Sequence, residues 1–292
     1  MATVGMIGLG IMGGAMARNL VAAGFTVIGF DVSAEACTRA RGDGVTIAAN
    51  VAEAARSAPH VLTSLPSPKA VLAVAREIAD AGVPQRIVAE TSTLALADKE
   101  AFAEILRADG HVPLDCPLSG TGAQAQTRDL VVFASGDAAA IAALDPVFAG
   151  FSRKVQVLGA FGDGTKMKFV ANLLVAINNV ASAEAMVLGM KAGLDPSQII
   201  ECVTTGAANS RIFELRAPMM AKDAYLPATM KLDIWKKDMA VIGAFAAGLD
   251  CPVPLFSASN TYYDAAIANG RGPEDAAAVC TVLADMAGLT RR

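Results

Sequence analysis

The residues best suited to proton transfer lie at helical spacing in one long apolar segment. Lys168, Asn172 and Asn179 follow one another at intervals of four and seven residues, which places them on one face of a helix. A lysine held against apolar walls has its ammonium form disfavoured by desolvation, so it can exchange a proton near neutral pH. The same spacing also fits a solvated lysine with asparagines that bridge to neighbouring helices. The spacing alone leaves both interpretations open.

A second candidate site is a glycine-rich turn between a predicted strand and a predicted helix. Gly8 permits a tight turn, Gly10 lets the backbone approach a pyrophosphate, and Gly13 allows the helix to pack closely on the strand. The helix N-terminus supplies free N–H groups to a phosphate. The motif therefore predicts a dinucleotide site, and a glycine-rich turn that serves packing alone is the alternative. The predicted cofactor contacts in this turn are Gly8, Leu9, Gly10, Ile11, Met12 and Gly13.

An acidic residue at the end of the next predicted strand bears on the choice of dinucleotide. Asp31 follows the glycine-rich turn by roughly 20 residues, where a carboxylate accepts hydrogen bonds from the adenosine ribose. Because a carboxylate there would repel a 2′-phosphate, NAD is favoured over NADP. Arg39 and Arg41 lie nearby and would weaken that preference. The alternative is that Asp31 caps a helix or stabilises a turn.

A serine–glycine turn at residues 119–122 is suited to binding an anion. Open α/β sheets bind ligands beyond the carboxyl ends of their strands, and successive backbone N–H groups favour a carboxylate. The predicted substrate contacts are therefore Ser119, Gly120 and Thr121. The alternative is an ordinary turn in which Ser119 caps a helix.

Short β-like segments and alanine-rich helical segments alternate in the first half of the chain. The predicted strands cover residues 4–8, 26–31, 60–64, 86–91, 111–113, 130–134 and 155–158. This β-α repetition predicts a parallel sheet with helices on both faces. From residue 165 to residue 192 one helical pattern runs without interruption, and mostly helical signals follow, at residues 196–203, 230–247 and 254–268. We therefore predict an α/β dinucleotide-binding domain over residues 1–163, and a long helix plus an all-helical domain over residues 164–292.

Composition excludes several classes of protein. The 292 residues include 24 Lys and Arg against 28 Asp and Glu, which offers no basic surface for nucleic acid or an anionic membrane. The five cysteines form no CxxC pair and there are two histidines, so we expect neither a disulfide framework nor a metal site. The longest apolar run carries three asparagines and Glu184, which a membrane span rarely tolerates. We expect a cytoplasmic protein without nucleic-acid or membrane partners.

Together these motifs resemble the β-hydroxyacid dehydrogenases of the 3-hydroxyisobutyrate dehydrogenase type, within the 6-phosphogluconate dehydrogenase superfamily. The resemblance covers essentially the whole chain. It rests on residues 8–20, 115–120, 162–172 and 235–238, which occur in the family's order and at its spacing. The resemblance implies a Rossmann-like domain, a long interdomain helix and a helical domain that supports a homodimer or homotetramer, with the substrate site between the two domains.

The resemblance also implies a reaction, the reversible oxidation of a small anionic hydroxy acid with hydride transfer to or from NAD. In that reaction Lys168 would be the general acid and base, and Asn172 would orient Lys168 and the substrate oxygen. Ser119, with the backbone of Gly120 and Thr121, would hold the substrate carboxylate. The further residues that match cofactor-lining positions of the family are Leu65, Pro66, Thr93 and Lys237, of which the lysine also adds positive charge near the substrate.

The chain departs from the family pattern at several positions. Thr121 and the pair Thr127–Arg128 stand where glycines are usual, Ala171 where asparagine is frequent, and Glu90 where aspartate is common. These departures leave the catalytic pair unchanged, so they put the substrate in doubt rather than the reaction. Thr121 adds bulk and a hydroxyl beside the carboxylate position, which would suit a polyhydroxylated acid.

Three alternatives remain open. One is an NADPH-dependent reductase of a semialdehyde or of glyoxylate, against which Asp31 argues. Another is imine reduction, although related imine reductases lack the lysine that Lys168 supplies. The third is a catalytically silent binding module, against which the presence of Lys168, Asn172 and Ser119 argues.

Overall fold

The computed structural model describes residues 2–289 and divides the chain into two units, Met1–Lys168 and Phe169–Arg292. The described strands of the first unit form a nine-stranded sheet in the order β3-β2-β1-β4-β5-β6-β8-β7, with β9 on β8. The strands are β1 (Thr3–Ile7), β2 (Thr26–Phe30), β3 (Thr46–Ile47), β4 (His60–Thr63), β5 (Ile87–Glu90), β6 (Val112–Asp115), β7 (Leu118–Ser119), β8 (Val131–Gly136) and β9 (Lys154–Val157).

The sheet is parallel from β3 to β6, as the β-α repetition predicts, and it departs from that arrangement beyond β6. There β8 pairs antiparallel with β6 and with β7, while β9 is parallel to β8. A parallel return needs a crossover of a dozen or more residues, usually a helix. The connection from β6 to β8 holds the two-residue β7 and the short helix α6 (Gly122–Gln126), so no long crossover helix carries the chain back to the start of the sheet.

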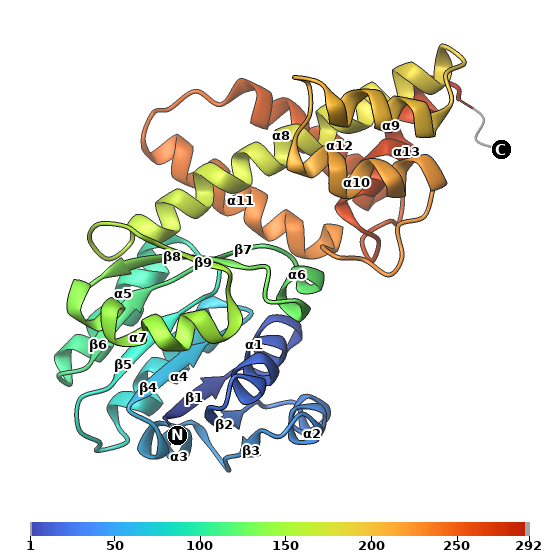
Figure 1. Ribbon diagram of the computed structural model, residues 1–292. Helices are drawn as coiled ribbons and strands as arrows, with labels where there is room; N and C mark the ends of the chain where they lie inside the picture. The colour runs from blue at the N-terminus through green and yellow to red at the C-terminus, as the bar shows by residue number, and fades with distance from the viewer. Residues whose placement is uncertain (1, 290–292) are drawn as a thin grey trace. The chain divides into compact units, whose positions relative to one another are not determined.

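Helices cover both faces of this sheet (Figure 1). One apolar core includes Met6 and Leu62 of the sheet with residues of α1 and α7, and the other includes Ile7 and Val61 with residues of α3, α4 and α5. Neighbouring residues of one strand thus belong to opposite cores, because successive side chains of a strand point to opposite faces. The helices are α1 (Ile11–Ala22), α2 (Ala34–Gly42), α3 (Val51–Ser57), α4 (Pro68–Ala79), α5 (Leu96–Ala108) and α7 (Ala138–Phe151).

The long predicted helix is present as α8 (Asp163–Lys191), which starts in the first unit and continues in the second. The described part of the second unit is otherwise helical, apart from an isolated β-bridge between Lys231 and Asp275. The helical C-terminal part is therefore confirmed. Its further elements are α9 (Pro196–Thr205), α10 (Arg211–Lys222), α11 (Leu232–Gly248), α12 (Pro254–Ala268), a 3-10 turn (Ala276–Ala278) and α13 (Val279–Met286).

Helix α8 is long and apolar enough to cross a membrane by length and composition, but its polar residues have partners inside the second unit. The Asn179 side chain donates to the Tyr263 hydroxyl at 3.0 Å and to the Ala276 carbonyl at 2.9 Å. Tyr263 in turn donates to the Ala176 carbonyl at 2.9 Å. These bonds are those of a core helix in a packed helical unit.

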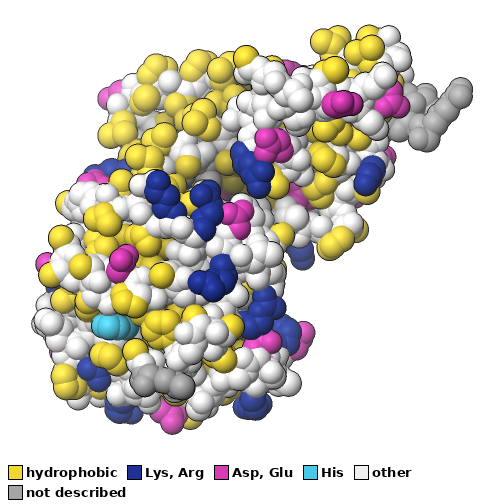
Figure 2. Space-filling view, viewed as in Figure 1, with side chains coloured by type: hydrophobic (Ala, Val, Ile, Leu, Met, Phe, Trp, Pro, Cys, Tyr) yellow, Lys and Arg dark blue, Asp and Glu magenta, His cyan; other side chains and the backbone are white. Residues whose placement is uncertain are grey.

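Part of the helical surface is apolar. Val170, Leu174 and Leu188 of α8 are more than half exposed, as is Leu255 of α12. Figure 2 shows hydrophobic side chains gathered on the face of the helical unit that it presents. Large exposed apolar areas are typical of surfaces that contact a partner.

Candidate active site

The glycine-rich turn joins β1 to α1, and its three glycines serve different purposes. Gly8 has a φ of +90°, and a Cβ there would overlap the Ser64 carbonyl oxygen. A Cβ on Gly13 would overlap the Gly8 carbonyl oxygen, whereas one on Gly10 would have no heavy atom within 4 Å. The fold therefore requires glycine at positions 8 and 13. At position 10 no protein atom requires it, which fits a site where a ligand comes close to the backbone.

The start of α1 is suited to a phosphate. Gly10 is the N-cap residue and provides no side-chain hydrogen bond to the first turn, so the amide groups there are available to an anion. Ile11 is exposed, whereas the Leu9 side chain is buried in the core. The loop thus fits a dinucleotide pyrophosphate, with Leu9 presenting only backbone to it.

Asp31, directly after β2, is hydrogen-bonded to the same turn. Its carboxylate accepts from the Leu9 amide at 2.6 Å and from the Ser33 amide at 2.8 Å, one bond to each oxygen. The turn-stabilising interpretation of Asp31 therefore has structural support. It leaves room for the ribose interpretation, because each carboxylate oxygen has a further lone pair. The next side chain, Val32, is 94% exposed and brings no positive charge for a 2′-phosphate.

The segments after β4 and β5 lie beside the glycine-rich turn. The Ser64 amide donates to the Ile7 carbonyl at 2.9 Å, and the Leu65 amide donates to the Ser92 hydroxyl at 2.8 Å. The structure thus brings the turn, Leu65–Pro66 and the segment with Thr93 to the carboxyl ends of β1, β4 and β5. The strand order reverses between β1 and β4, and doubly wound sheets bind dinucleotides at that position.

The serine–glycine turn follows β7 and is rigidly held. Thr121, rather than Ser119, is the N-cap of α6, because its hydroxyl accepts from the Gln124 amide at 3.5 Å. The Gln124 side chain accepts from the Thr121 amide at 3.0 Å and donates to Asp129 at 3.0 Å. The Thr121 amide is therefore engaged within the protein, and its hydroxyl takes part in the cap, at 3.4 Å from the Gln124 side-chain oxygen. The contact of Thr121 with the substrate stays a prediction. Ser119 and the Gly120 amide stay as the predicted anion contacts.

Lys168 and Asn172 lie one turn apart on α8, and both are buried. The Asn172 side chain donates to the Asp238 carboxylate of α11 at 3.1 Å, and the Lys237 ammonium lies 3.6 Å from the other oxygen of Asp238. The polar face predicted for this helix therefore has two parts. Asn172 belongs to a charged cluster with residues of α11. Asn179 instead bridges to neighbouring helical elements, which was the alternative interpretation of the spacing.

Asp238 lies in the segment 235–238 that resembles the family, but the sequence predicted no role for it. The signal was its position, since Asp238 lies three residues after Trp235 and four before Ile242, both buried, and so belongs to the buried face of α11. A carboxylate on a buried helix face needs a partner. Asn172 is one of its partners.

A second group of charged residues that the sequence did not single out as a site is fully buried in the first unit. The Lys99 ammonium of α5 lies 3.0 Å from Asp115 and also forms an ion pair with Glu90. Burial by itself lowers the pKa of Lys99, but attraction to Asp115 and Glu90 outweighs it and raises that pKa to about 12. The available signal was the helical spacing of Lys99 with Phe102 and Leu106, which places a charge on the apolar face of α5.

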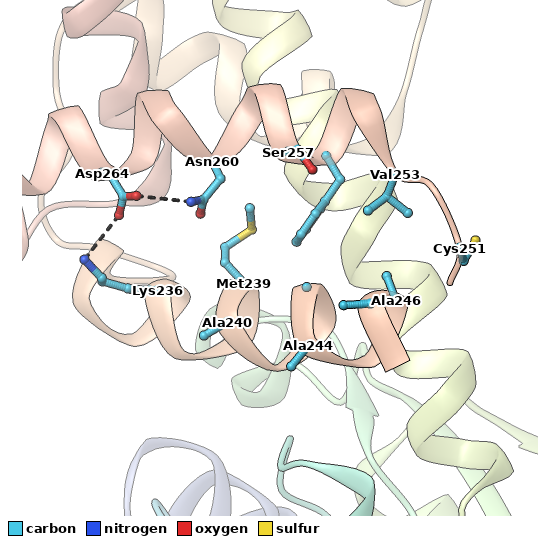
Figure 3. A pocket seen from close by; sticks show the side chains of 13 residues that line it. Lys236, Met239, Ala240, Ala244, Ala246, Cys251, Val253, Ser257, Asn260 and Asp264 are labelled. Carbon is cyan, nitrogen blue, oxygen red and sulfur yellow. Dashed lines mark hydrogen bonds and ion pairs between the residues drawn. The ribbon is translucent and has the colours of Figure 1, made fainter. Parts of the chain in front are cut away.

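A groove of about 550 Å³ lies in the second unit between α11 and α12 (Figure 3). At one end of it the Lys236 ammonium pairs with Asp264 at 3.2 Å, and Asn260 donates to the same carboxylate at 3.1 Å. None of the predicted site residues lines this groove. For a metal, residues 2–289 contain no group of three or more His, Cys, Asp or Glu side chains placed to hold an ion.

Comparison with known proteins decides the family. The family model described as the NAD binding domain of 6-phosphogluconate dehydrogenase matches residues 3–159. The model described as the NAD-binding part of NADP-dependent 3-hydroxyisobutyrate dehydrogenase matches residues 162–283. The L-threonate dehydrogenase of Cupriavidus necator is 34% identical over 96% of this chain and 95% of its own length. The chain belongs to the β-hydroxyacid dehydrogenase family.

Other β-hydroxyacid dehydrogenases extend the comparison. The 3-sulfolactaldehyde reductase of Escherichia coli is 30% identical over 100% of this chain and 99% of its own. The crystal structure of 3-hydroxyisobutyrate dehydrogenase from Salmonella typhimurium superposes with a TM-score of 0.86 at 30% identity, covering 97% of this chain and 100% of that one. The chain is thus an NAD(P)-dependent oxidoreductase of the hydroxyacid dehydrogenase family, and its Rossmann-like fold and family resemblance are confirmed.

Proposed function

We propose that this β-hydroxyacid dehydrogenase uses NAD to oxidise a small polyhydroxylated acid, with a four-carbon sugar acid of the threonate type as the first candidate. The observation that carries the reaction is the buried pair of Lys168 and Asn172, one turn apart on α8. The substrate class is supported by the name of the 34% identical relative, which covers nearly the whole chain. The preference for NAD is supported by Asp31 and by the exposed, uncharged Val32 after it.

In the proposed mechanism Lys168 moves the proton. Its amine takes the proton of the substrate hydroxyl during oxidation, and its ammonium returns a proton to the carbonyl oxygen during reduction. Bound NAD supplies the hydride acceptor. Asn172, whose amide is held by Asp238 at 3.1 Å, keeps a fixed orientation toward Lys168 and the reacting oxygen. Ser119 and the Gly120 amide bind the carboxylate, and Lys237 adds local positive charge for the anionic substrate of a chain whose formal net charge is −4.

The test is a panel of three- to five-carbon hydroxy acids assayed for NAD reduction, with NADP in parallel and the corresponding aldehydes and keto acids assayed in reverse. We expect the highest kcat/KM with a polyhydroxylated acid and NAD. A clear preference for NADPH with a semialdehyde would instead support the reductase alternative, which the 30% identical 3-sulfolactaldehyde reductase represents.

Lys168→Ala tests the catalytic assignment in the same assay. We expect kcat to fall by a factor of about 10² to 10⁴, the usual contribution of a general acid or base, while the Kd for NADH stays within about twofold. If the variant kept most of its kcat, Lys168 would not be the proton-transfer group.

We also propose that the protein is a homodimer or homotetramer. The apolar residues Val170, Leu174 and Leu188 on the surface of α8 support an interface there. Light scattering coupled to size-exclusion chromatography measures the mass directly, and a mass of one chain at micromolar concentration would contradict this proposal.

A further inference from the structure

The buried cluster of Lys99, Glu90 and Asp115 has no role in the mechanism above, and its contacts suggest one. All three side chains are completely buried. Removing charges from water is costly, and a buried ion pair often stabilises a fold no better than apolar residues of the same volume would. Stability alone is therefore a weak reason for the cluster, and what its members hold in place is more informative.

On one side the cluster holds the first turn of α8. Asp115 accepts from the Thr165 amide at 2.7 Å and from the Thr165 hydroxyl at 2.8 Å. The Gly164 amide donates to the Ser135 hydroxyl at 2.9 Å, and that hydroxyl lies 3.3 Å from Asp115. Asp115 thus binds the Thr165 amide and Ser135 binds the Gly164 amide, two of the groups that a helix N-terminus leaves without a partner inside the helix. Lys168 follows Thr165 by three residues on the same helix.

The fit around this turn is close. A Cβ on Gly164 would overlap the Phe133 carbonyl oxygen and would lie 2.8 Å from the Asp115 carbonyl oxygen. The start of α8 therefore rests directly on the backbone of β6 and β8. A shift of Asp115 moves this turn, and with it the position of Lys168.

On its other side the cluster holds the loops predicted to line the nicotinamide. Glu90 accepts from the Ser92 amide at 2.9 Å, and the Ser92 hydroxyl accepts from the Leu65 amide at 2.8 Å. Lys99 also donates to the Glu90 carbonyl at 3.3 Å. One ammonium group is thus bonded to the carboxylate that holds α8 and to the residue that holds the cofactor loops.

The positive charge of Lys99 is needed for this arrangement. The Asp115 carboxylate accepts from Lys99 and from both the amide and the hydroxyl of Thr165. The Ser135 hydroxyl, with one proton, lies 3.2 Å from the Asp115 carbonyl oxygen and 3.3 Å from its carboxylate. Without Lys99 the cluster would hold two buried carboxylates and no cation, and these like charges would repel each other away from water. Lys99 and the Thr165 hydroxyl bond to the same oxygen of Asp115, so loss of the ammonium group removes the contact that fixes this oxygen against the first turn of α8.

From these contacts we propose that Lys99 is a positioning residue for catalysis, which acts through Asp115 on the start of α8 and so on Lys168. The proposal rests on the proposed function, in which Lys168 transfers the proton. Lys99 itself does not touch the substrate. Its effect is on geometry, and proton and hydride transfer are sensitive to displacements of about 1 Å.

The test is a double-mutant cycle between Lys99→Met and Lys168→Ala. In the native background we expect Lys99→Met to lower kcat by about 10- to 100-fold. In the Lys168→Ala background the same change should alter the residual rate by less than about twofold, because residues that act as a unit are not additive. An equal loss in both backgrounds would overturn the proposal. A Lys168→Ala variant that kept its kcat would overturn the proposed function instead, whatever Lys99→Met did.

Thr165→Val covers the case in which Lys99→Met does not fold, because it removes one hydroxyl bond to Asp115 and leaves every charge in place. We expect a kcat loss of about 3- to 10-fold that disappears in the Lys168→Ala background. An unchanged kcat in a folded Thr165→Val enzyme would contradict the proposal.

A matched control is the other buried ion pair, Arg216 with Asp275 at 3.6 Å, which belongs to the helical unit. Arg216→Met should lower the melting temperature and leave kcat within about twofold when assayed well below that temperature. A loss of kcat as large as that of Lys99→Met would mean that any destabilised variant loses activity, and the positioning role would be refuted.

Discussion

Glycine-to-alanine changes in the turn after β1 can separate the glycine that serves a ligand from those that serve the fold. Gly10 has a φ of −66° and a ψ of −160°, an extended conformation that alanine can adopt, and its Cβ would have no neighbour within 4 Å. Gly13 has no such space, because its Cβ would overlap the Gly8 carbonyl oxygen. The two substitutions add the same methyl group and should fail for different reasons.

For stability, two small terms nearly cancel at Gly10. Alanine is a poorer N-cap than glycine by up to about 1 kcal/mol, and it lowers the entropy of the unfolded chain, which stabilises the protein by about 0.4–1 kcal/mol. Gly13→Ala forces backbone to move and should lose about 3 kcal/mol or more, at the upper end of overpacking costs. For binding, a methyl group on Gly10 would displace the pyrophosphate from the α1 amides. Loss of one hydrogen bond to a charged group, about 1.5–3 kcal/mol, weakens NADH binding by roughly 10- to 100-fold.

The assay is a fluorescence titration with NADH beside a thermal unfolding curve for each variant. Gly42→Ala is the control, because it adds a methyl group to open space at the end of α2. We expect it to leave NADH binding unchanged and to raise the unfolding temperature slightly, because alanine lowers the entropy of the unfolded chain. If Gly10→Ala bound NADH as tightly as Gly42→Ala does, this turn would not be the pyrophosphate site and the argument from its open space would fail.

The remaining predictions concern the proposed ribose contact of Asp31, the carboxylate partner of Asn172 and the response to pH. Asp31→Asn should lower the ratio of kcat/KM for NAD to that for NADP by about tenfold, because a carboxylate repels a 2′-phosphate; an unchanged ratio would refute the ribose contact. Asp238→Ala removes the carboxylate that accepts from the Asn172 amide at 3.1 Å. Steady-state kinetics should show kcat lowered by about tenfold, the effect of losing one hydrogen bond to a charged group, with NADH affinity nearly unchanged. A normal kcat would show that Asn172 needs no such support. Burial raises the pKa of Tyr263 to about 12. Burial lowers the pKa of Lys99, but attraction to Asp115 and Glu90 outweighs it and raises this pKa to about 12. Both groups then stabilise the fold below their unfolded pKa values, near 10 and 10.5, and this stability is lost as the pH rises through about 12. Urea unfolding midpoints should therefore fall between pH 10 and pH 12, and a constant midpoint would contradict the cited shifts.

Local patterns in the sequence predicted the elements that carry strong periodicity. Every predicted strand of the first half has a counterpart in the sheet, and the predicted helix over residues 165–192 corresponds to α8 (Asp163–Lys191). The strands β3 and β7, of two residues each, were missed because two residues show no alternation. Helix α10 was also missed, since Pro218 inside it is a signal against a helix.

The sequence pairs polar residues that lie in a single segment, and it does not pair residues of distant segments that meet only in the fold. Lys168 and Asn172 lie four residues apart, so helical spacing alone pairs them. Lys99, Glu90 and Asp115 come from α5, β5 and β6, and only the packing of α5 against the sheet brings the lysine between the two carboxylates. Long-range ion pairs of this kind have no local sequence pattern, although a charge on the apolar face of a helix indicates that a partner must exist.

The cap on α6 has a consequence for how substrates bind. Hydrogen bonds link Thr121 to Gln124 and Gln124 to Asp129, and Arg153 pairs with Asp129 at 2.7 Å, so several contacts order the segment after Ser119. A segment that is already ordered loses little conformational entropy when a ligand binds. In the proposed function, binding of the carboxylate should then need little rearrangement of this turn. Its association rate should depend on diffusion and charge rather than on loop closure. In the proposed function, selectivity among acids would then depend on the part of the substrate beyond the carboxylate.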